Sequence, residues 1–231
     1  MNQISDVFNG DCMEYLTQFS DKFFDLAICD LPYGIKQDGR KNHTRGGHTY
    51  FNGIKSKAKA KAKAKDYRSM SLYDSISPNQ SVFDEIFRVS KNQIFWGANH
   101  FISKIPYNSS CWIVWNKMNY GNDFADCELA WTSFNSAVRK FDFRWNGMLQ
   151  GNMANKEQRI HPNHKPVQLY EFCLRNYAKQ GDKIVDPMMG GQSSRIAAYK
   201  IGFDYWGAEL DEYYFTAGCE RFKNSIAMPI F

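Results

Sequence analysis

Two short apolar runs in this chain of 231 residues each end in an acidic residue that is followed by a proline-containing turn. The first run, Phe24–Cys29, leads into Asp30-Leu31-Pro32-Tyr33, and the second leads into Asp186 and Pro187. Apolar runs of this length, bounded by turn residues, are typical of buried strands in a parallel sheet. Open α/β sheets bind ligands outside the carboxyl ends of their strands, so both acidic residues are placed where such a fold has its chemistry.

The remaining sequence alternates between strand-like and helix-like segments. The predicted helices are 13–19, 78–89, 165–177, 192–200 and 211–224. A strand is predicted to end within 7–11, and the other predicted strands are 24–29, 93–96, 112–115, 128–132, 138–143, 183–186 and 204–208. This alternation predicts one doubly wound, Rossmann-like α/β domain over residues 1–231 with a mostly parallel sheet. The strands between 112 and 143 leave little room for helices, which predicts an antiparallel edge made of a β-meander or a hairpin.

Residues 35–77 form a Lys- and Gly-rich insert without a sustained period, and a segment of this length is usually functional or mobile. It contains an alternating run of lysines, Lys55, Lys57, Lys59, Lys61, Lys63 and Lys65. Without these six residues the net charge of +5 would fall to 5 − 6 = −1. Such a run is either a solvated loop or a contact for phosphate, because polyanions release counterions when they bind lysine. We expect 55–65 to be disordered when no polyanion is bound.

The composition excludes several classes of protein. The chain has no apolar run long enough to cross a membrane and no secretory signal peptide, so we expect a cytoplasmic protein. The six cysteines stand alone, without a Cys-x-x-Cys pair, and are expected to be reduced core residues. We expect no metal site, and either a monomer or a homodimer.

The second junction has the features of a cofactor site. Gly190 and Gly191 allow a tight turn, and the helix that follows offers unpaired N–H groups. About twenty residues later Glu209 ends the next strand, where an acid typically accepts hydrogen bonds from ribose. Together these features indicate a nucleoside-bearing cofactor, although a helix cap beside a surface acid would look the same. The turn is not G-x-G-x-x-G, which disfavours a nicotinamide oxidoreductase.

Taken together, the two junctions resemble the permuted DNA amino-methyltransferases, which modify adenine N6 or cytosine N4. Asp30-Leu31-Pro32-Tyr33 is similar to the Asp-Pro-Pro-Tyr motif of that family, and 186–194 is similar to its late cofactor motif. Segments 9–12 and 161–166 are similar to further motifs of that family, and segments 112–117 and 127–132 look closest to phage- and prophage-type adenine methylases. The resemblance covers nearly the whole chain except about 35–77.

The resemblance implies S-adenosyl-L-methionine as cofactor and double-stranded DNA as partner. It also implies catalytic residues, namely Asp30, Leu31, Pro32 and Tyr33. The cofactor contacts that it implies are Asp11, Cys12, Asp30, Lys165, Asp186, Met188, Gly190, Ser193 and Glu209. The sequence departs from the family pattern at Leu31, Met188 and Gln192, and the last two departures lie near the expected cofactor.

The implied mechanism activates a flipped base. Asp30 and the carbonyl of Leu31 would accept both N–H groups of the amine and free its lone pair, while the base stacks on Tyr33 through the ring and not the hydroxyl. Cytosine N4 methylation and a DNA-binding relic of the fold remain alternatives. A restriction partner, an orphan regulator and a phage enzyme are not distinguished by sequence.

DNA contacts are expected at two places. The first is the lysine run, at Lys55, Lys57, Lys59 and Lys61. The second is Arg139 and Arg144, beside a short linker over 144–164 that is a possible target-recognition segment. The mixture of cations and aromatic residues near Arg144 suits a DNA face, although a charged edge strand would look the same.

Overall fold

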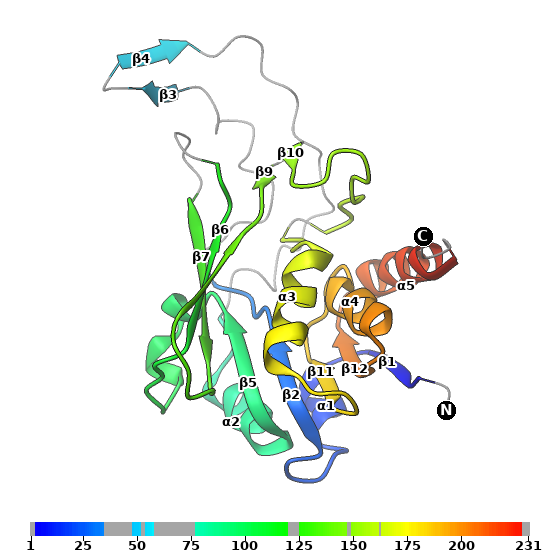
Figure 1. Cartoon of the computed structure of the whole chain (residues 1–231). Coiled ribbons are helices and arrows are strands. Elements are labelled where there is room, and N and C mark those ends of the chain that lie inside the picture. Colours follow the sequence, from blue (N-terminus) through cyan, green and yellow to red (C-terminus); the bar gives the residue numbers. More distant parts are fainter. Residues whose placement is uncertain are drawn as a thin grey trace.

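The computed structural model describes residues 3–34, 48–51, 54–57, 77–119, 125–146, 149–161 and 163–227. Its main body is a single eight-stranded sheet with the order β1-β12-β11-β2-β5-β7-β6-β8 (Figure 1). These strands are β1 (Ser5–Asn9), β2 (Phe24–Cys29), β5 (Ser90–Trp96), β6 (Trp112–Asn116), β7 (Cys127–Thr132), β8 (Arg139–Asp142), β11 (Lys183–Asp186) and β12 (Asp204–Glu209). The mostly parallel α/β sheet expected from the sequence is confirmed.

Helices cover both faces of the sheet. They are α1 (Cys12–Leu16), α2 (Gln80–Val89), α3 (Val167–Tyr177), α4 (Ser193–Ile201) and α5 (Glu212–Ala227). Successive side chains of β2 point to opposite faces of the sheet, as they do in any β-strand. Leu26 and Ile28 pack in the core under α3 and α4, whereas Ala27 and Cys29 pack in the core under α1 and α2.

The antiparallel part of the sheet differs in detail from its prediction. β7 pairs antiparallel with both β5 and β6, so a β6–β7 hairpin is present. The meander alternative is wrong, because β7 lies between β5 and β6, and β8 pairs with β6 in parallel. β7 suits this central place because its apolar residues Ala130 and Trp131 are buried in the cores on opposite faces of the sheet.

Two small ribbons lie outside the main sheet. β9 (Trp145–Asn146) and β10 (Leu149–Gln150) pair antiparallel above the carboxyl ends of the central strands (Figure 1). β3 (His48–Phe51) and β4 (Ile54–Lys57) form the other ribbon. Lys55 and Lys57 lie in β4, opposite Tyr50 and His48 of β3, and the expected disorder of the whole run stays a prediction. Lys59 and Lys61 lie outside the described residues.

The cysteines are free, as expected, but they are not all core residues. Cys12, Cys29, Cys111 and Cys173 are buried, whereas Cys127 is exposed at the start of β7. No helix among the described residues is long and apolar enough to cross a membrane. The part of the chain that the structure describes also contains no group of three or more His, Cys, Asp or Glu side chains that could bind a metal ion.

Candidate active site

The predicted site residues meet at the carboxyl edge of four adjacent parallel strands. β2 lies beside β11, with Val185 opposite Ala27, and β11 lies beside β12. β12 in turn lies beside β1, with Glu209 opposite Asn9. This order places Asp30, Asp186, Glu209 and Asp11 at or just beyond successive strand ends, although they are far apart in the sequence. The two junctions identified from sequence are therefore neighbours in space.

Asp30 and Tyr33 contact each other at the end of β2. The Tyr33 hydroxyl donates a hydrogen bond to Asp30 Oδ1 over 3.0 Å. The ring of Tyr33 stacks on His100, with centroids 4.8 Å apart and planes 15° from parallel. Gly97 makes room for this ring, since a Cβ at Gly97 would lie 2.1 Å from it. The sequence analysis assigned a role only to the Tyr33 ring. The structure shows that the Tyr33 hydroxyl also has a hydrogen-bond partner, Asp30.

Lys165 lies against this pair and not in the cofactor turn, although the sequence placed it among the cofactor contacts. Its Nζ is 2.5 Å from Asp30 Oδ1 and 3.0 Å from the Tyr33 hydroxyl. A second carboxylate, Glu128 of β7, lies 3.1 Å from the same Nζ. Lys117, just after β6, forms an ion pair with Glu128. The sequence analysis did not identify Glu128 or Lys117 as site residues. The available signal was a lone acidic residue within the largely apolar strand Cys127–Thr132.

These groups shift one another's pKa values. Burial raises the pKa of Asp30, and the Lys165 ammonium opposes that rise. Burial alone would lower the pKa of Lys165, but the carboxylates of Asp30 and Glu128 raise it above its ordinary value. Burial likewise acts to raise the pKa of Glu128, yet Lys165 and Lys117 outweigh it and lower that pKa to about 2. The cluster is therefore two anions compensated by two cations inside the protein.

The turn after β11 is built around Asp186. Its carboxylate accepts hydrogen bonds from the Met188 N–H over 3.2 Å and from the Ser194 hydroxyl over 2.6 Å. Burial raises the pKa of Asp186 to about 7. Gly190 has a φ of 49°, a left-handed conformation that glycine adopts without strain. These contacts close the predicted cofactor turn directly beside β2.

Glu209 reaches into the same turn from β12. One carboxylate oxygen accepts from the Gly190 N–H and the other from the Asp211 N–H, both over 2.9 Å. Burial raises the pKa of Glu209, and these two N–H groups oppose the rise. A carboxylate has about four lone-pair sites, so two remain for a ligand. Glu209 therefore both shapes the turn and presents acceptors to the edge.

Ser193 faces the protein interior. Its hydroxyl donates to the Lys165 carbonyl over 2.7 Å and lies 3.1 Å from His164 Nε2. Arg221 of α5 donates to the Gly191 carbonyl over 2.6 Å and forms an ion pair with Glu157 over 2.7 Å. Ser193 thus connects the turn to the start of α3, and Arg221 connects it to the segment before α3. Sequence analysis did not identify Arg221 or Glu157.

The first turn of α1 completes the edge. Asp11 caps the helix by accepting from the Met13 N–H over 2.7 Å. Cys12 is buried behind it, and burial raises the pKa of its thiol to about 12. Arg139 and Arg144 are exposed on and after β8. The structure therefore brings Asp11 and Cys12 to the site, and places the two arginines at the outer edge of the sheet.

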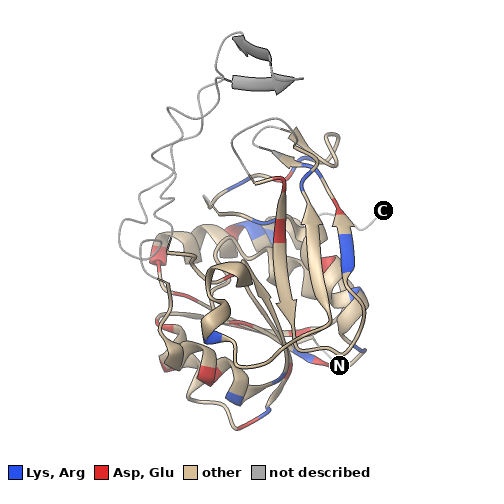
Figure 2. Ribbon diagram, turned by 90° about the vertical axis from the view of Figure 1, so that its left-hand side faces the viewer, with Lys and Arg blue, Asp and Glu red and all other residues tan. Residues whose placement is uncertain are grey.

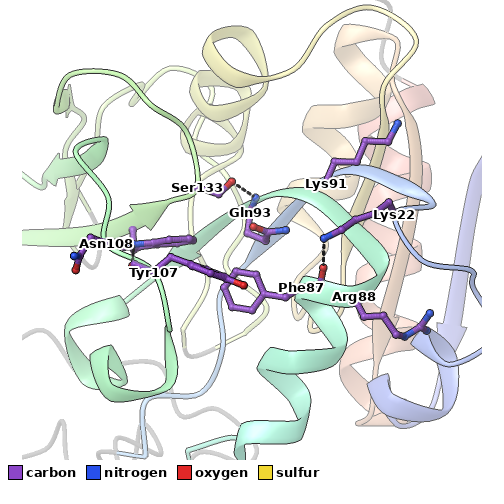
Figure 3. A pocket seen from close by; sticks show the side chains of 9 residues that line it. Lys22, Phe87, Arg88, Lys91, Gln93, Tyr107, Asn108 and Ser133 are labelled. Carbon is purple, nitrogen blue, oxygen red and sulfur yellow. Dashed lines mark hydrogen bonds between the residues drawn. The ribbon is translucent and has the colours of Figure 1, made fainter.

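A pocket of about 470 Å³ lies at the opposite, amino-terminal edge of the sheet (Figure 3). Its cations already have partners within the protein. Lys22 donates to the Phe87 and Ser90 carbonyls, Arg88 pairs with Asp21, and Lys91 pairs with Asp25. This pocket is separate from the edge that carries Asp30.

The comparison with protein families shows which family this chain belongs to. The model of one family, described as DNA methylase and covering adenine N6 and cytosine N4 enzymes, matches residues 24–220. The chain belongs to this DNA methylase family. The matched range contains the Asp30 junction and the Asp186 junction, together with Glu128 and Lys165.

Individual relatives of this DNA methylase are distant. The type II methyltransferase M2.MboI of Moraxella bovis is 22% identical over 89% of this chain and 82% of its own length. The putative methylase YubD of Escherichia coli strain K12 is 22% identical over 92% of this chain and 87% of its own length.

Solved structures share the fold of this DNA methylase. The structure described as the putative DNA modification methylase TTHA0409 of Thermus thermophilus, in complex with S-adenosyl-L-methionine, has a TM-score of 0.59 at 16% identity, and the match covers 97% of both chains. The cytosine-N4-specific PvuII methyltransferase has a TM-score of 0.57 at 12% identity, covering 95% of this chain and 87% of its own. At these identities the likeness concerns the fold alone.

Proposed function

We propose that this DNA methylase transfers a methyl group from S-adenosyl-L-methionine to the N6 amine of adenine in DNA. One observation carries the proposal: the Asp30 tetrapeptide and the Asp186 turn lie on adjacent parallel strands. A base amine at Asp30 and a cofactor at the turn would therefore be neighbours. Most of the catalytic gain in such a site comes from positioning and electrostatics.

The donor set fits the cofactor. S-adenosyl-L-methionine supplies an electrophilic methyl group on a positively charged sulfur when it is bound. The carboxylates of Asp11, Asp186 and Glu209 offer acceptors for its amino and hydroxyl groups along one edge. Met188, which is partly buried against the core, supplies an apolar wall. We propose cofactor contacts at this turn, with Ser193 and Lys165 supporting them from behind.

The base amine is activated by the protein groups at the end of β2. Asp30 and the Leu31 carbonyl accept the two N–H groups, which draws the nitrogen toward tetrahedral geometry and frees its lone pair. As the N–C bond forms, the methyl–sulfur bond would break with its electron pair left on sulfur, and the extra amine proton would pass to the Asp30 carboxylate and from there to solvent. The base stacks on the Tyr33 ring, outside the duplex. His100 already covers one face of that ring.

Cytosine N4 is the second candidate, because the same family includes both activities. Asp at position 30 favours adenine by resemblance to the adenine-specific members. Both bases present an amine beside a ring nitrogen, so the groups at Asp30 would serve either one. The fold shared with the cytosine-N4-specific PvuII enzyme is compatible with the alternative.

DNA contacts are proposed at the insert and above the site. Lys and Arg are interspersed with Asp and Glu over the described body (Figure 2), and the six lysines at 55–65 account for the net positive charge. The insert is therefore the main source of sequence-independent attraction to phosphate. The β9–β10 ribbon lies above the carboxyl edge (Figure 1), which suits 144–164 as the recognition segment.

The test is to incubate unmethylated plasmid DNA with the purified protein and S-adenosyl-L-methionine. Sequencing then locates the modified bases, and nucleoside analysis identifies the product. N6-methyladenine at a defined site supports the proposal, and N4-methylcytosine replaces it with the second candidate. An absence of methylation together with an absence of cofactor binding by calorimetry would point to a DNA-binding relic. Asp30→Ala is the matched inactive control.

A further inference from the structure

Lys165 lies between two carboxylates that come from different parts of the sheet. Its Nζ is 2.5 Å from Asp30 Oδ1 and 3.1 Å from Glu128 Oε2. The Lys165 side chain is only 6% exposed, so water does not screen these charges strongly. Glu128 stands two strands away from Asp30, on the reversed strand β7. One ammonium therefore joins the proposed acceptor of the base amine to a second anion.

Glu128 is fixed by a cation of its own. Lys117, just beyond the end of β6, forms an ion pair with Glu128 Oε1, while Lys165 contacts Oε2. The Lys117 ammonium also lies 5.2 Å from the centre of the Trp115 ring. Trp115 is the direct cross-strand partner of Glu128. Each carboxylate oxygen of Glu128 thus contacts a different ammonium group. The Lys117–Glu128 ion pair lies within the β6–β7 hairpin.

The arrangement poses a problem for catalysis. Asp30 Oδ1 receives both the Lys165 ammonium and the Tyr33 hydroxyl. A carboxylate in a close ion pair is a weaker hydrogen-bond acceptor and a weaker base, so the ammonium competes with an incoming amine for Asp30. A longer contact between Lys165 and Asp30 Oδ1 would make Asp30 a stronger acceptor for the amine. Glu128 is already within ion-pair distance of the same Nζ.

Building on the proposed methyl transfer, we propose that Glu128 is a positioning residue that draws the Lys165 ammonium from Asp30 as the base amine arrives. Glu128 itself contacts neither the base nor the cofactor. It acts through Lys165, and Lys117 sets how strongly it acts. Asp30 then presents an ionised carboxylate to the amine while the cluster keeps its overall charge balance.

Several charged or titratable groups surround Asp30 and set its ionisation. They are Cys29 and Tyr33 on its own segment, Lys165 and Tyr170 at α3, Glu128 on β7 and Asp186 on β11. The Glu128 charge raises the pKa of Asp30, whereas Lys165 lowers it. Removing the Glu128 charge must therefore shift Asp30 toward ionisation at lower pH, with Lys165 bound more tightly to it.

The experiment compares variants with opposite effects on this balance. Glu128→Gln leaves Lys165 on Asp30, so kcat should fall on the order of 100-fold. The KM for S-adenosyl-L-methionine should stay within about 2-fold, because Glu128 does not contact the cofactor turn. In a plot of kcat against pH, the acidic limb, which we assign to the ionisation of Asp30, should move to lower pH. Lys117→Met strengthens the pull of Glu128 on Lys165, so the same limb should move to higher pH.

The controls separate positioning from structural damage. Glu128→Asp keeps the charge and should recover part of kcat. Asp25→Asn removes an anion from the Lys91 ion pair at the opposite edge of the sheet and should leave kcat and its pH profile unchanged. A general loss of structure would reduce kcat without moving the acidic limb in opposite directions for the two cluster variants.

The outcomes are distinct. If Glu128→Gln has the kcat of the unaltered protein, or if its acidic limb stays in place, the positioning role is refuted while methyl transfer stands. If Glu128→Gln fails to fold, the limb shift of Lys117→Met decides, and an unmoved limb refutes the role. If the unaltered protein methylates no DNA, the proposed function fails and this inference fails with it.

Discussion

Gln192 packs into the space that Gly218 leaves open on α5. A Cβ at Gly218 would lie 2.7 Å from Gln192 Cγ. The Gln192 amide donates to the Phe215 carbonyl over 3.1 Å and accepts from Arg195 over 2.9 Å. This residue departs from the glycine that the family resemblance implies, and it has a φ of 60°. Its side chain points to α5, so the departure does not place a side chain into the cofactor turn.

Gly218→Ala should therefore displace Gln192 and strain the turn. Overpacking of this kind costs about 1–3 kcal/mol, and we expect a loss of that size in the free energy of unfolding. Gln192→Gly combined with Gly218→Ala should recover most of it, because the clash is removed and glycine accepts the positive φ. Denaturant unfolding of the two single variants and the double variant measures the coupling. Additive effects would contradict the contact.

Glu209→Ala should weaken the binding of S-adenosyl-L-methionine. It removes the acceptor for the Gly190 N–H as well as the lone pairs available to the ligand. The loss of hydrogen bonds of this kind costs about 1–3 kcal/mol, which is roughly 5-fold to 150-fold in Kd. Calorimetric titration measures it. Glu212→Ala, an exposed acid at the start of α5, is the control and should bind normally. Equal affinities for all three proteins would remove Glu209 from the site.

Tyr33→Phe should reduce kcat by about 10-fold, the equivalent of one hydrogen bond of about 1.4 kcal/mol. The reason is that the Tyr33 hydroxyl bonds to both Asp30 and Lys165. Tyr33→Ala should lose considerably more, since the stacking ring is also removed. Single-turnover methylation measures both variants, with Tyr107→Phe at the opposite edge as control. A Tyr33→Phe variant of unchanged rate would support the stacking role alone.

The pH dependence of stability should report on Asp186. Its folded-state pKa of about 7 lies above the ordinary value of 3.8, so the folded protein binds the extra proton between these pH values. The Asp186 contribution to stability is therefore fully present below about pH 4 and is lost as pH rises to about 7. The slope is on the order of 1.4 kcal/mol per pH unit.

Asp186→Asn isolates this contribution. His161 acts in the opposite sense, because burial lowers its pKa to about 3 and its contribution rises with pH up to about 6.5. The informative quantity is consequently the difference between the variant and the unaltered protein. Relative to the latter, Asp186→Asn should gain stability as pH rises from 4 to 7. A constant difference across that range would show that Asp186 stays ionised.

Deletion of 55–65 should weaken DNA binding by a similar factor for every DNA sequence and flatten its salt dependence. The lysines neutralise phosphates and release counterions but do not read bases. The methylated site should stay the same. Binding of specific and unrelated duplexes across a salt series measures this. An unchanged salt slope would make the run a linker, and a changed target site would make it part of the recognition element.

The sequence by itself determined the local elements of this protein. The apolar runs predicted β2 at 24–29 and β11 at 183–186 with their observed bounds. The acidic residues that end them, and the glycines after Asp186, indicated a site at a sheet edge. These features are readable because apolar period and turn chemistry act over a few neighbouring residues.

Only the tertiary structure decided which side chains meet. Asp30 and Lys165 are separated by 135 positions, and their contact depends on α3 packing beside β2. Glu128 reaches them only because β7 inserts between β5 and β6, an order that local pattern does not specify. Ser193 and Arg221 likewise gain their partners from helix packing. Burial and long-range contacts set the charges and hydrogen bonds of the site, and these depend on the whole chain rather than on any one segment.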